Sequence, residues 1–284
     1  MSRIVYVNGQ YVPEENAVIS VFDRGFLFAD AVYEVSSVLE GKLIDNPRHL
    51  ARLRRSLDEL SMASPATDEE ILNIQRELIK QNQLKEGLIY LQVTRGSADR
   101  DFPFPSDTSP GLVMFSQSKK ILDVPQAREG VGIISVPDLR WKRRDIKTVG
   151  LLAQVLAKQA AKDAGAADAW MVEDGFVTEG TSNNAFIVDA DGKLITRHLG
   201  NEILPGVTRA AVLELVKLEN IVFEERQFTI DEAKNASEAF VTSSTTFVWP
   251  VVKIDGHSIG NGKPGPIAHR LREIYVQSSL AAGV

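Results

Sequence analysis

The first part of the chain alternates hydrophobic and polar positions with a period of two, which predicts antiparallel strands. Ile4–Val7 and Tyr11–Val12 flank an Asn8-Gly9 turn of the kind favoured in two-residue hairpins. Residues 31–39 are rich in β-branched and aromatic side chains and end at a Glu40-Gly41-Lys42 turn. This opening segment therefore predicts a meander of antiparallel strands.

After Pro47 the hydrophobic period becomes helical. The leucines that carry it are Leu50, Leu53, Leu57 and Leu60. A second helix is predicted over residues 68–82, and strands over 87–94 and 112–115. The N-terminal part of the chain is thus predicted to be α+β.

A polar segment then breaks both periods, and we interpret residues 119–128 as an interdomain linker. It separates an N-terminal α+β domain, residues 1–118, from a C-terminal domain, residues 129–284. In the C-terminal domain, strands are predicted over 132–136, 168–188, 194–196, 221–228, 239–243 and 248–254, and helices over 150–164, 206–218 and 264–280.

Composition narrows the function classes. The length of 284 residues suits two domains or one large one, and 44% apolar residues can bury a sizeable core. Lys and Arg number 32 against 38 Asp and Glu, a net charge of −6, and there is no basic run. Nucleic-acid binding depends on neutralising phosphates, so we expect no nucleic-acid partner.

The absence of cysteine excludes disulfides, thiol catalysis and cysteine-ligated zinc. The four histidines stand apart without metal-ligand spacing, so we expect no metal site. No stretch approaches the roughly 18 apolar residues of a membrane span. Met1-Ser2-Arg3 leads directly into a strand pattern instead of the apolar core of a signal peptide. We therefore expect a cytoplasmic protein without a membrane partner.

Four segments are candidates for chemistry. Lys147 lies between a predicted strand and a helix, flanked by Ile146 and Val149, where desolvation would make its amine nucleophilic. Residues 203–209 open a helix whose first backbone N–H groups suit an anion. Residues 177–186 place a glutamate before small polar residues, and 241–246 form a hydroxyl cluster. Each segment alone also has an ordinary structural interpretation. Lys147 suits a surface lysine, and residues 203–209 suit the start of any helix. Residues 177–186 suit a hairpin turn, and residues 241–246 suit a turn whose hydroxyls bond within it.

Taken jointly, the spacing of these segments resembles a family signature. The positions that carry it are Glu179, Thr181, Asn184-Ala185-Phe186, Leu194, Thr196, Leu204, Gly206-Val207 and Arg209. The pattern resembles the class-IV aminotransferases, which are pyridoxal 5'-phosphate (PLP) enzymes of fold type IV. Further segments resemble the bacterial D-amino-acid branch, namely 23–25, 29–35, 49–56, 90–96, 145–147 and 156–159.

The resemblance implies a two-domain α/β homodimer of fold type IV, with a smaller N-terminal α+β domain and a larger C-terminal mixed-sheet, barrel-like domain. It implies that Lys147 is the Schiff-base lysine and also moves the proton at the substrate Cα. It implies that Glu179 keeps the pyridine nitrogen of the cofactor protonated.

The resemblance also implies a phosphate site. Arg52 is expected to bind phosphate oxygens with its guanidinium fork. The backbone N–H groups of Val207 and Thr208, with Ser244, are expected to complete the site, and Leu204 to pack on the cofactor ring.

For the substrate, the resemblance implies that Tyr33 and Arg100 bind the α-carboxylate, with Arg100 supplied by the partner subunit. Val35 and Thr245 are further expected contacts. The family pattern usually has a histidine two residues after that arginine, and this sequence has Phe102 there. The substitution removes a hydrogen-bond donor and makes the pocket more apolar, although Phe102 also suits a loop aromatic that packs on its own prolines.

The function that the resemblance implies is a ping-pong transamination between a D-amino acid, such as D-alanine, and 2-oxoglutarate. One alternative is a branched-chain L-amino-acid or (R)-amine aminotransferase of the same fold. Another is a PLP lyase such as aminodeoxychorismate lyase, and a third is a non-enzymatic binding protein on the same scaffold.

Overall fold

The alternating pattern at the start of the chain forms the predicted antiparallel sheet. The computed structural model describes residues 2–284, and the chain divides into two compact units. The first unit runs to Lys120 and also takes in Ile146–Gly150 and Ala282–Val284, which the sequence-based division assigned to the C-terminal domain. The second unit comprises Ile121–Asp145 and Leu151–Ala281.

The first unit is built on a six-stranded sheet of order β2-β1-β6-β5-β3-β4, in which all neighbours are antiparallel. Its strands are β1 (Ile4–Val7), β2 (Gln10–Pro13), β3 (Ala31–Leu39), β4 (Lys42–Leu43), β5 (Glu86–Thr94) and β6 (Gly111–Ser118). Its helices are η1 (Glu14–Asn16), α1 (Arg24–Phe28), α2 (Asn46–Glu59) and α3 (Asp68–Gln81).

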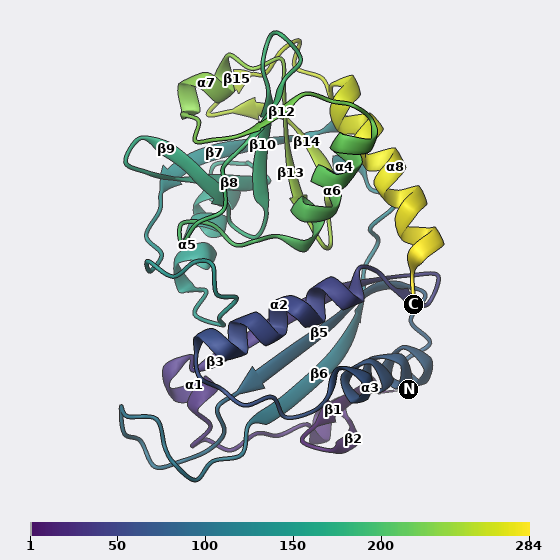
Figure 1. Cartoon of the computed structure of the whole chain (residues 1–284), viewed down its shortest axis with the longest axis vertical. Coiled ribbons are helices and arrows are strands. Elements are labelled where there is room, and N and C mark those ends of the chain that lie inside the picture. The colour runs from purple at the N-terminus through teal and green to yellow at the C-terminus, as the bar shows by residue number, and fades with distance from the viewer. Residues whose placement is uncertain (1) are drawn as a thin grey trace. The chain divides into compact units, whose positions relative to one another are not determined.

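The two long helices of this unit cover one face of its sheet (Figure 1). The leucines that predicted α2 bury against the sheet, with Leu53 and Leu57 almost fully enclosed. A capping box of Thr67 and Glu70 fixes the start of α3. Buried positions on β3 point toward α2, so Tyr33 and Val35 lie on the opposite, half-buried face.

The second unit holds a nine-stranded mixed sheet, ordered β12-β11-β10-β13-β14-β7-β8-β9, with β15 on β14. Its strands are β7 (Val131–Pro137), β8 (Asp168–Glu173), β9 (Phe176–Gly180), β10 (Asn184–Val188), β11 (Leu194–Thr196), β12 (Phe223–Glu225), β13 (Glu238–Ser243), β14 (Phe247–Ile254) and β15 (His257–Ser258). Its helices are α4 (Pro125–Glu129), α5 (Leu152–Asp163), α6 (Val207–Leu218), α7 (Ile230–Lys234) and α8 (Pro266–Ala282).

This sheet curls, because a short turn joins its last strand β9 to the internal strand β10 through a bond from Gly180 N to Asn183 O. The predicted mixed α/β fold class is confirmed. The strand predicted over residues 221–228 is shorter in the structure, where only β12 forms. The polar segment 119–128, predicted as a linker, contains the start of α4. No helix within residues 2–284 combines the length and apolar content needed to cross a bilayer.

Candidate active site

Lys147 lies in a segment of the first unit that extends along β3. Its carbonyl oxygen accepts from Tyr33 N at 3.0 Å, and Val149 N donates to Ala31 O at 3.2 Å. Ile146 is buried in the core of the same unit, while Lys147 itself is half-buried. Backbone pairing on both sides therefore fixes the backbone from which the Lys147 side chain extends.

The amine of Lys147 lies against an aromatic ring. Lys147 Nζ is 4.2 Å from the centroid of the Tyr33 ring, within the range in which a π face attracts an ammonium group. Tyr33 stacks on Tyr90, and Tyr90 stacks on Phe115, which builds an aromatic row across β3, β5 and β6. The structure thus brings the predicted lysine and the predicted substrate residue Tyr33 together, and Val35 follows on the same face of β3.

On the other face of β3, Arg52 is held by a buried carboxylate. Arg52 Nε and Nη2 donate to the two oxygens of Glu34 at 2.8 and 2.7 Å. His49 Nδ1 lies 2.7 Å from Glu34 Oε2 and must be the donor, because a carboxylate only accepts. All three side chains are buried. The guanidinium fork that was predicted to bind phosphate therefore faces Glu34.

These groups shift each other's ionisation. Burial raises the pKa of Glu34, but the Arg52 charge and the hydrogen bonds from Arg52 and His49 outweigh burial and hold this pKa at about 2. Burial lowers the pKa of His49 against the opposing effect of Glu34, which favours a neutral imidazole. The cluster thus contains one anion, Glu34, paired with one cation, Arg52, while His49 is neutral.

Glu179 is the central acceptor of the second unit. It lies near the end of β9, with 4% of its surface exposed. Asn184 Nδ2 donates to its Oε2 at 2.9 Å, and Leu204 N lies 3.2 Å from both oxygens. Arg140 Nη1 donates to its Oε1. Three N–H donors from separate segments converge on this carboxyl group.

Arg140 joins Glu179 to a second buried carboxylate. Arg140 Nε and Nη2 donate to Asp138 at 3.0 and 2.7 Å, and Thr178 Oγ1 donates to Asp138 Oδ2 at 2.6 Å. Burial raises the pKa of Glu179, and the Arg140 charge offsets this effect only in part. Arg140 therefore holds the Glu179 carboxyl in a fixed orientation while sharing its charge with Asp138.

The N-terminus of α6 lies next to this network. Asn184 Nδ2 also donates to Leu204 O at 3.0 Å, two residues before the cap residue Gly206. A Cβ on Gly206 would lie 2.0 Å from Asn184 Oδ1, so a larger residue there would displace the Asn184 side chain. No side chain caps α6 and its first turn has no acidic residue, so the N–H groups of Val207 and Thr208 lie at an uncapped helix end. Thr208 Oγ1 is buried without a hydrogen-bond partner.

Ser244 and Thr245 occupy the turn between β13 and β14, where both are half-buried. The flanking hydroxyls Ser243 Oγ and Thr246 Oγ1 bond to each other at 2.8 Å. The predicted hydroxyl cluster is thus a turn that satisfies part of its own polar groups.

Arg100 and Phe102 lie in the exposed loop of the first unit between β5 and β6. Phe102 is 74% exposed, and its ring is 5.6 Å from that of Phe28. The Phe102 side chain therefore contacts α1 through Phe28, and most of its surface remains exposed to solvent.

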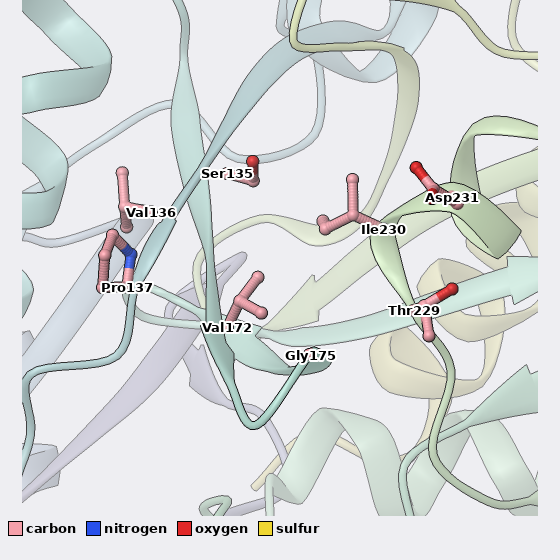
Figure 2. A pocket seen from close by; sticks show the side chains of 8 residues that line it. All are labelled: Ser135, Val136, Pro137, Val172, Gly175, Thr229, Ile230 and Asp231. Carbon is pink, nitrogen blue, oxygen red and sulfur yellow. The ribbon is translucent and has the colours of Figure 1, made fainter.

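A surface hollow of the second unit contains none of the predicted site residues (Figure 2). It is lined by Ser135, Val136, Pro137, Val172, Gly175, Thr229, Ile230 and Asp231. Its hydroxyls serve the fold, because Thr229 Oγ1 caps α7 by accepting from Glu232 N and Ser135 Oγ donates to Asp255. Within residues 2–284, no group of three or more His, Cys, Asp or Glu is arranged to hold a metal ion.

Comparison with known proteins decides the family. The family described as amino-transferase class IV matches residues 31–254. The chain belongs to the class IV aminotransferases. The membership predicted from the Glu179 to Arg209 spacing is confirmed, and the protein is an enzyme that transfers amino groups.

This aminotransferase resembles curated relatives along its whole length. It is 39% identical over 272 residues to the D-alanine aminotransferase of Staphylococcus aureus (strain N315), covering 95% of each chain. It is 36% identical over 277 residues to the D-alanine aminotransferase of Bacillus licheniformis, covering 98% of this chain and 97% of the relative.

Solved structures of this aminotransferase fold agree. The branched-chain amino acid aminotransferase of T.th. complexed with N-(5'-phosphopyridoxyl)-L-glutamate matches with a TM-score of 0.90 and 27% identity, over 99% of this chain and 95% of that one. The Escherichia coli branched-chain amino acid aminotransferase matches with a TM-score of 0.93 over 98% and 95% of the two chains, and at 21% identity this likeness shows the fold alone. The predicted fold type is confirmed.

Sequence reasoning missed three residues that contact the predicted site residues of this aminotransferase. They are Glu34 on Arg52, Arg140 on Glu179, and Asn184, which was part of the motif without a role. The strand period carried a signal for Glu34, because it alternates with Tyr33 and so had to face the core. Arg140 lies 39 positions before Glu179, and no local pattern links the two.

Proposed function

We propose that this aminotransferase transfers the amino group of a D-amino acid, such as D-alanine, to 2-oxoglutarate in a ping-pong reaction, with pyridoxal 5'-phosphate as cofactor. The observation that carries the proposal is the whole-length similarity to D-alanine aminotransferases. When bound, the cofactor supplies an aldehyde that condenses with amines and a pyridine ring that withdraws electrons.

Lys147 is the proposed attachment point of the cofactor. Its Nζ lies 4.2 Å from the centroid of the Tyr33 ring, beside a proposed substrate ligand. With the cofactor bound, the same Nζ would serve as the base that takes the proton from the substrate Cα. Backbone pairing of residues 146–149 with β3 limits how far this proton carrier can move.

Glu179 is the proposed partner of the pyridine nitrogen. Its oxygens already accept from Arg140, Asn184 and Leu204 N, and a carboxylate offers about four acceptor positions, so one further N–H donor fits. A pyridine nitrogen that carries a proton is such a donor. The donor set of the structure therefore suits a carboxylate that keeps the ring protonated.

The N-terminus of α6 is the proposed phosphate site. Thr208 Oγ1 is buried without a partner, and Gly206 leaves no Cβ beside Asn184, which together suit an anion at this helix end. The N–H groups of Val207 and Thr208 would donate to the phosphate, as would the Ser244 hydroxyl. Leu204 would pack on the ring.

Arg52 is proposed to add a positive charge to phosphate binding, with its guanidinium fixed by Glu34. Glu34 accepts from two nitrogens of this guanidinium, Nε and Nη2, and so holds its plane in one orientation. The buried pair keeps the arginine charged and oriented, which suits a group that attracts a dianion.

Tyr33 and Arg100 are the proposed ligands of the substrate carboxylate, with Val35 and Thr245 as neighbouring contacts. We further propose that the enzyme is a cytoplasmic homodimer in which the partner subunit supplies Arg100. The first unit exposes Val18, Val21, Phe22 and Phe26, with exposed fractions of 75%, 66%, 53% and 69%. Exposed apolar groups of this kind mark protein contacts, and light scattering of the purified enzyme tests the dimer.

The amino donor is tested by half-reactions of the PLP form. D-alanine, L-leucine and (R)-1-phenylethylamine are added separately, and the visible absorbance of the bound cofactor is followed. Bleaching by D-alanine alone is the expected result. Bleaching chiefly by L-leucine or by the amine would favour a branched-chain L-amino-acid or (R)-amine aminotransferase. The apolar Phe102 beside Arg100 supports that alternative. No bleaching by any donor, with pyruvate released from a chorismate-type substrate, would identify a lyase.

A further inference from the structure

Arg24 is a buried arginine of the first unit that none of the proposed roles uses. It begins the short helix α1 and is 3% exposed. Its Nε donates to Asp30 Oδ2 at 2.9 Å, so its charge is paired. Its backbone N donates to Gly96 O at 2.9 Å, which ties α1 to the start of the loop that follows β5.

The remaining donors of the same guanidinium hold that loop. Arg24 Nη1 donates to Asp101 O at 2.7 Å, and Nη2 donates to Phe102 O at 3.3 Å. Because a guanidinium is rigid and planar, Asp30 on one edge fixes the direction in which the other nitrogens point. Arg24 therefore sets the backbone of residues 101–102, which directly follow Arg100.

Arg24 also shares an aromatic ring with Arg100. Arg24 Cζ is 4.6 Å from the centroid of the Phe28 ring, and Arg100 Cζ is 5.2 Å from the same centroid. Arg100 Cζ is also 5.6 Å from the ring of Phe102, whose carbonyl Arg24 holds. The exposed Arg100 thus lies against the rings of Phe28 and Phe102. Arg24 contacts the Phe28 ring and holds the backbone carbonyl of Phe102.

We propose that Arg24 is a positioning residue that fixes Arg100 for recognition of the substrate carboxylate. Arg24 acts through the loop and needs no contact with substrate. The inference rests on the proposed carboxylate-binding role of Arg100. It also gives Phe102 a use, because its ring supports Arg100 where the family pattern usually places a histidine.

Asp30 keeps a partner when Arg24 is changed. Arg95 Nε donates to the same Asp30 Oδ2 at 2.7 Å, while Arg95 Nη1 and Nη2 donate to Ser61 O and Leu60 O. A neutral side chain at position 24 therefore leaves no unpaired buried carboxylate, and we expect the first unit to keep its fold.

The test compares Arg24→Gln and Arg24→Lys with the parent, each alone and combined with Arg100→Ala. Arg54→Gln is the control, because Arg54 forms a half-exposed pair with Asp68 in the same unit. KM and kcat are measured for D-alanine. Trypsin cleavage after Arg100, in the variants that retain it, reports loop mobility independently of activity.

We expect Arg24→Gln to raise KM for D-alanine on the order of tenfold, with a smaller change in kcat, because misplacing a binding group weakens binding. Arg24→Lys retains the pair with Asp30 and should recover part of the loss. Trypsin should cleave Arg24→Gln faster than the parent, and Arg54→Gln should match the parent. In the Arg100→Ala background, Arg24→Gln should raise KM no further.

Four results would overturn the inference. An equal KM increase from Arg24→Gln with and without Arg100 would show that Arg24 acts only on the general fold. Unchanged trypsin cleavage would show that Arg24 does not hold the loop. If Arg100→Ala alone leaves KM unchanged, the proposed role of Arg100 fails and takes the inference with it. If instead Arg100→Ala raises KM and Arg24→Gln does not, the inference alone fails.

Discussion

Replacing Glu34 by Gln should destabilise the first unit strongly. Glu34 is 2% exposed, and the change removes the carboxylate that pairs with the buried Arg52 cation. The lowering of the Glu34 pKa from 4.5 to about 2 corresponds to about 3 kcal/mol of stabilisation. Breaking one side of a buried pair costs roughly 3–5 kcal/mol, which agrees. For a domain of this size the midpoint of thermal unfolding should fall by roughly 10 °C.

The pH dependence of stability gives the sharper signature. The folded pKa of Glu34 lies below its unfolded value of 4.5, so its contribution is fully present above about pH 5 and is lost as pH falls toward 2. Glutamine does not titrate. The difference in unfolding free energy between parent and Glu34→Gln should therefore be largest near neutral pH and should shrink steadily below pH 5.

Urea unfolding followed by circular dichroism between pH 7 and pH 3 measures this difference. Tryptophan fluorescence does not suit the purpose, because Trp141, Trp170 and Trp249 all belong to the second unit. Amide exchange of β3 and α2 should rise in the variant and so place the loss in the first unit. Glu77→Gln on α3 is the control, since its pair with Lys80 is exposed and should contribute less than about 1 kcal/mol. Parallel pH curves for parent and Glu34→Gln would refute the reasoning.

Three further changes test the site. Lys147→Ala should abolish turnover and the visible absorbance of bound cofactor, and substantial turnover would show that another lysine carries the chemistry. Arg100→Ala should raise KM for D-amino acids more than for amines without a carboxylate, and equal effects would remove Arg100 from carboxylate binding. Gly206→Ala should weaken cofactor affinity, measured by equilibrium dialysis, because its Cβ would lie 2.0 Å from Asn184 Oδ1; unchanged affinity would separate the start of α6 from the phosphate.

Local patterns predicted most of the elements correctly, and the reasons are visible in the structure. The helix expected after Pro47 is α2, because its leucine stripe had one sheet face to bury against. The strand over residues 31–39 is β3 to the residue. The short helices α1 and α7 escaped prediction, since five residues carry less than two periods and each depends on a cap, from Asp23 or Thr229.

Candidate site residues were less predictable, because their partners are distant in sequence. The family resemblance singled out Arg52 and Glu179, yet the groups that orient them, Glu34 and Arg140, belong to other elements. The division into units shows the same limit. Ile146 buries in the core of the first unit, although the chain around it belongs to the second. Tertiary packing decided each of these outcomes.

Each of the two units contains a buried carboxylate–arginine pair, and the purpose of burying these charges needs an explanation. Glu34 with Arg52 and Glu179 with Arg140 each enclose an anion and a cation, and well-packed apolar residues often replace such buried pairs in proteins without loss of stability. A buried pair is therefore poorly explained as a contribution to folding. It is well explained as a means of orienting one charged group where water cannot compete. In each pair the family resemblance points to one member and the structure supplies the other, so the structural partners extend the roles that the resemblance implies.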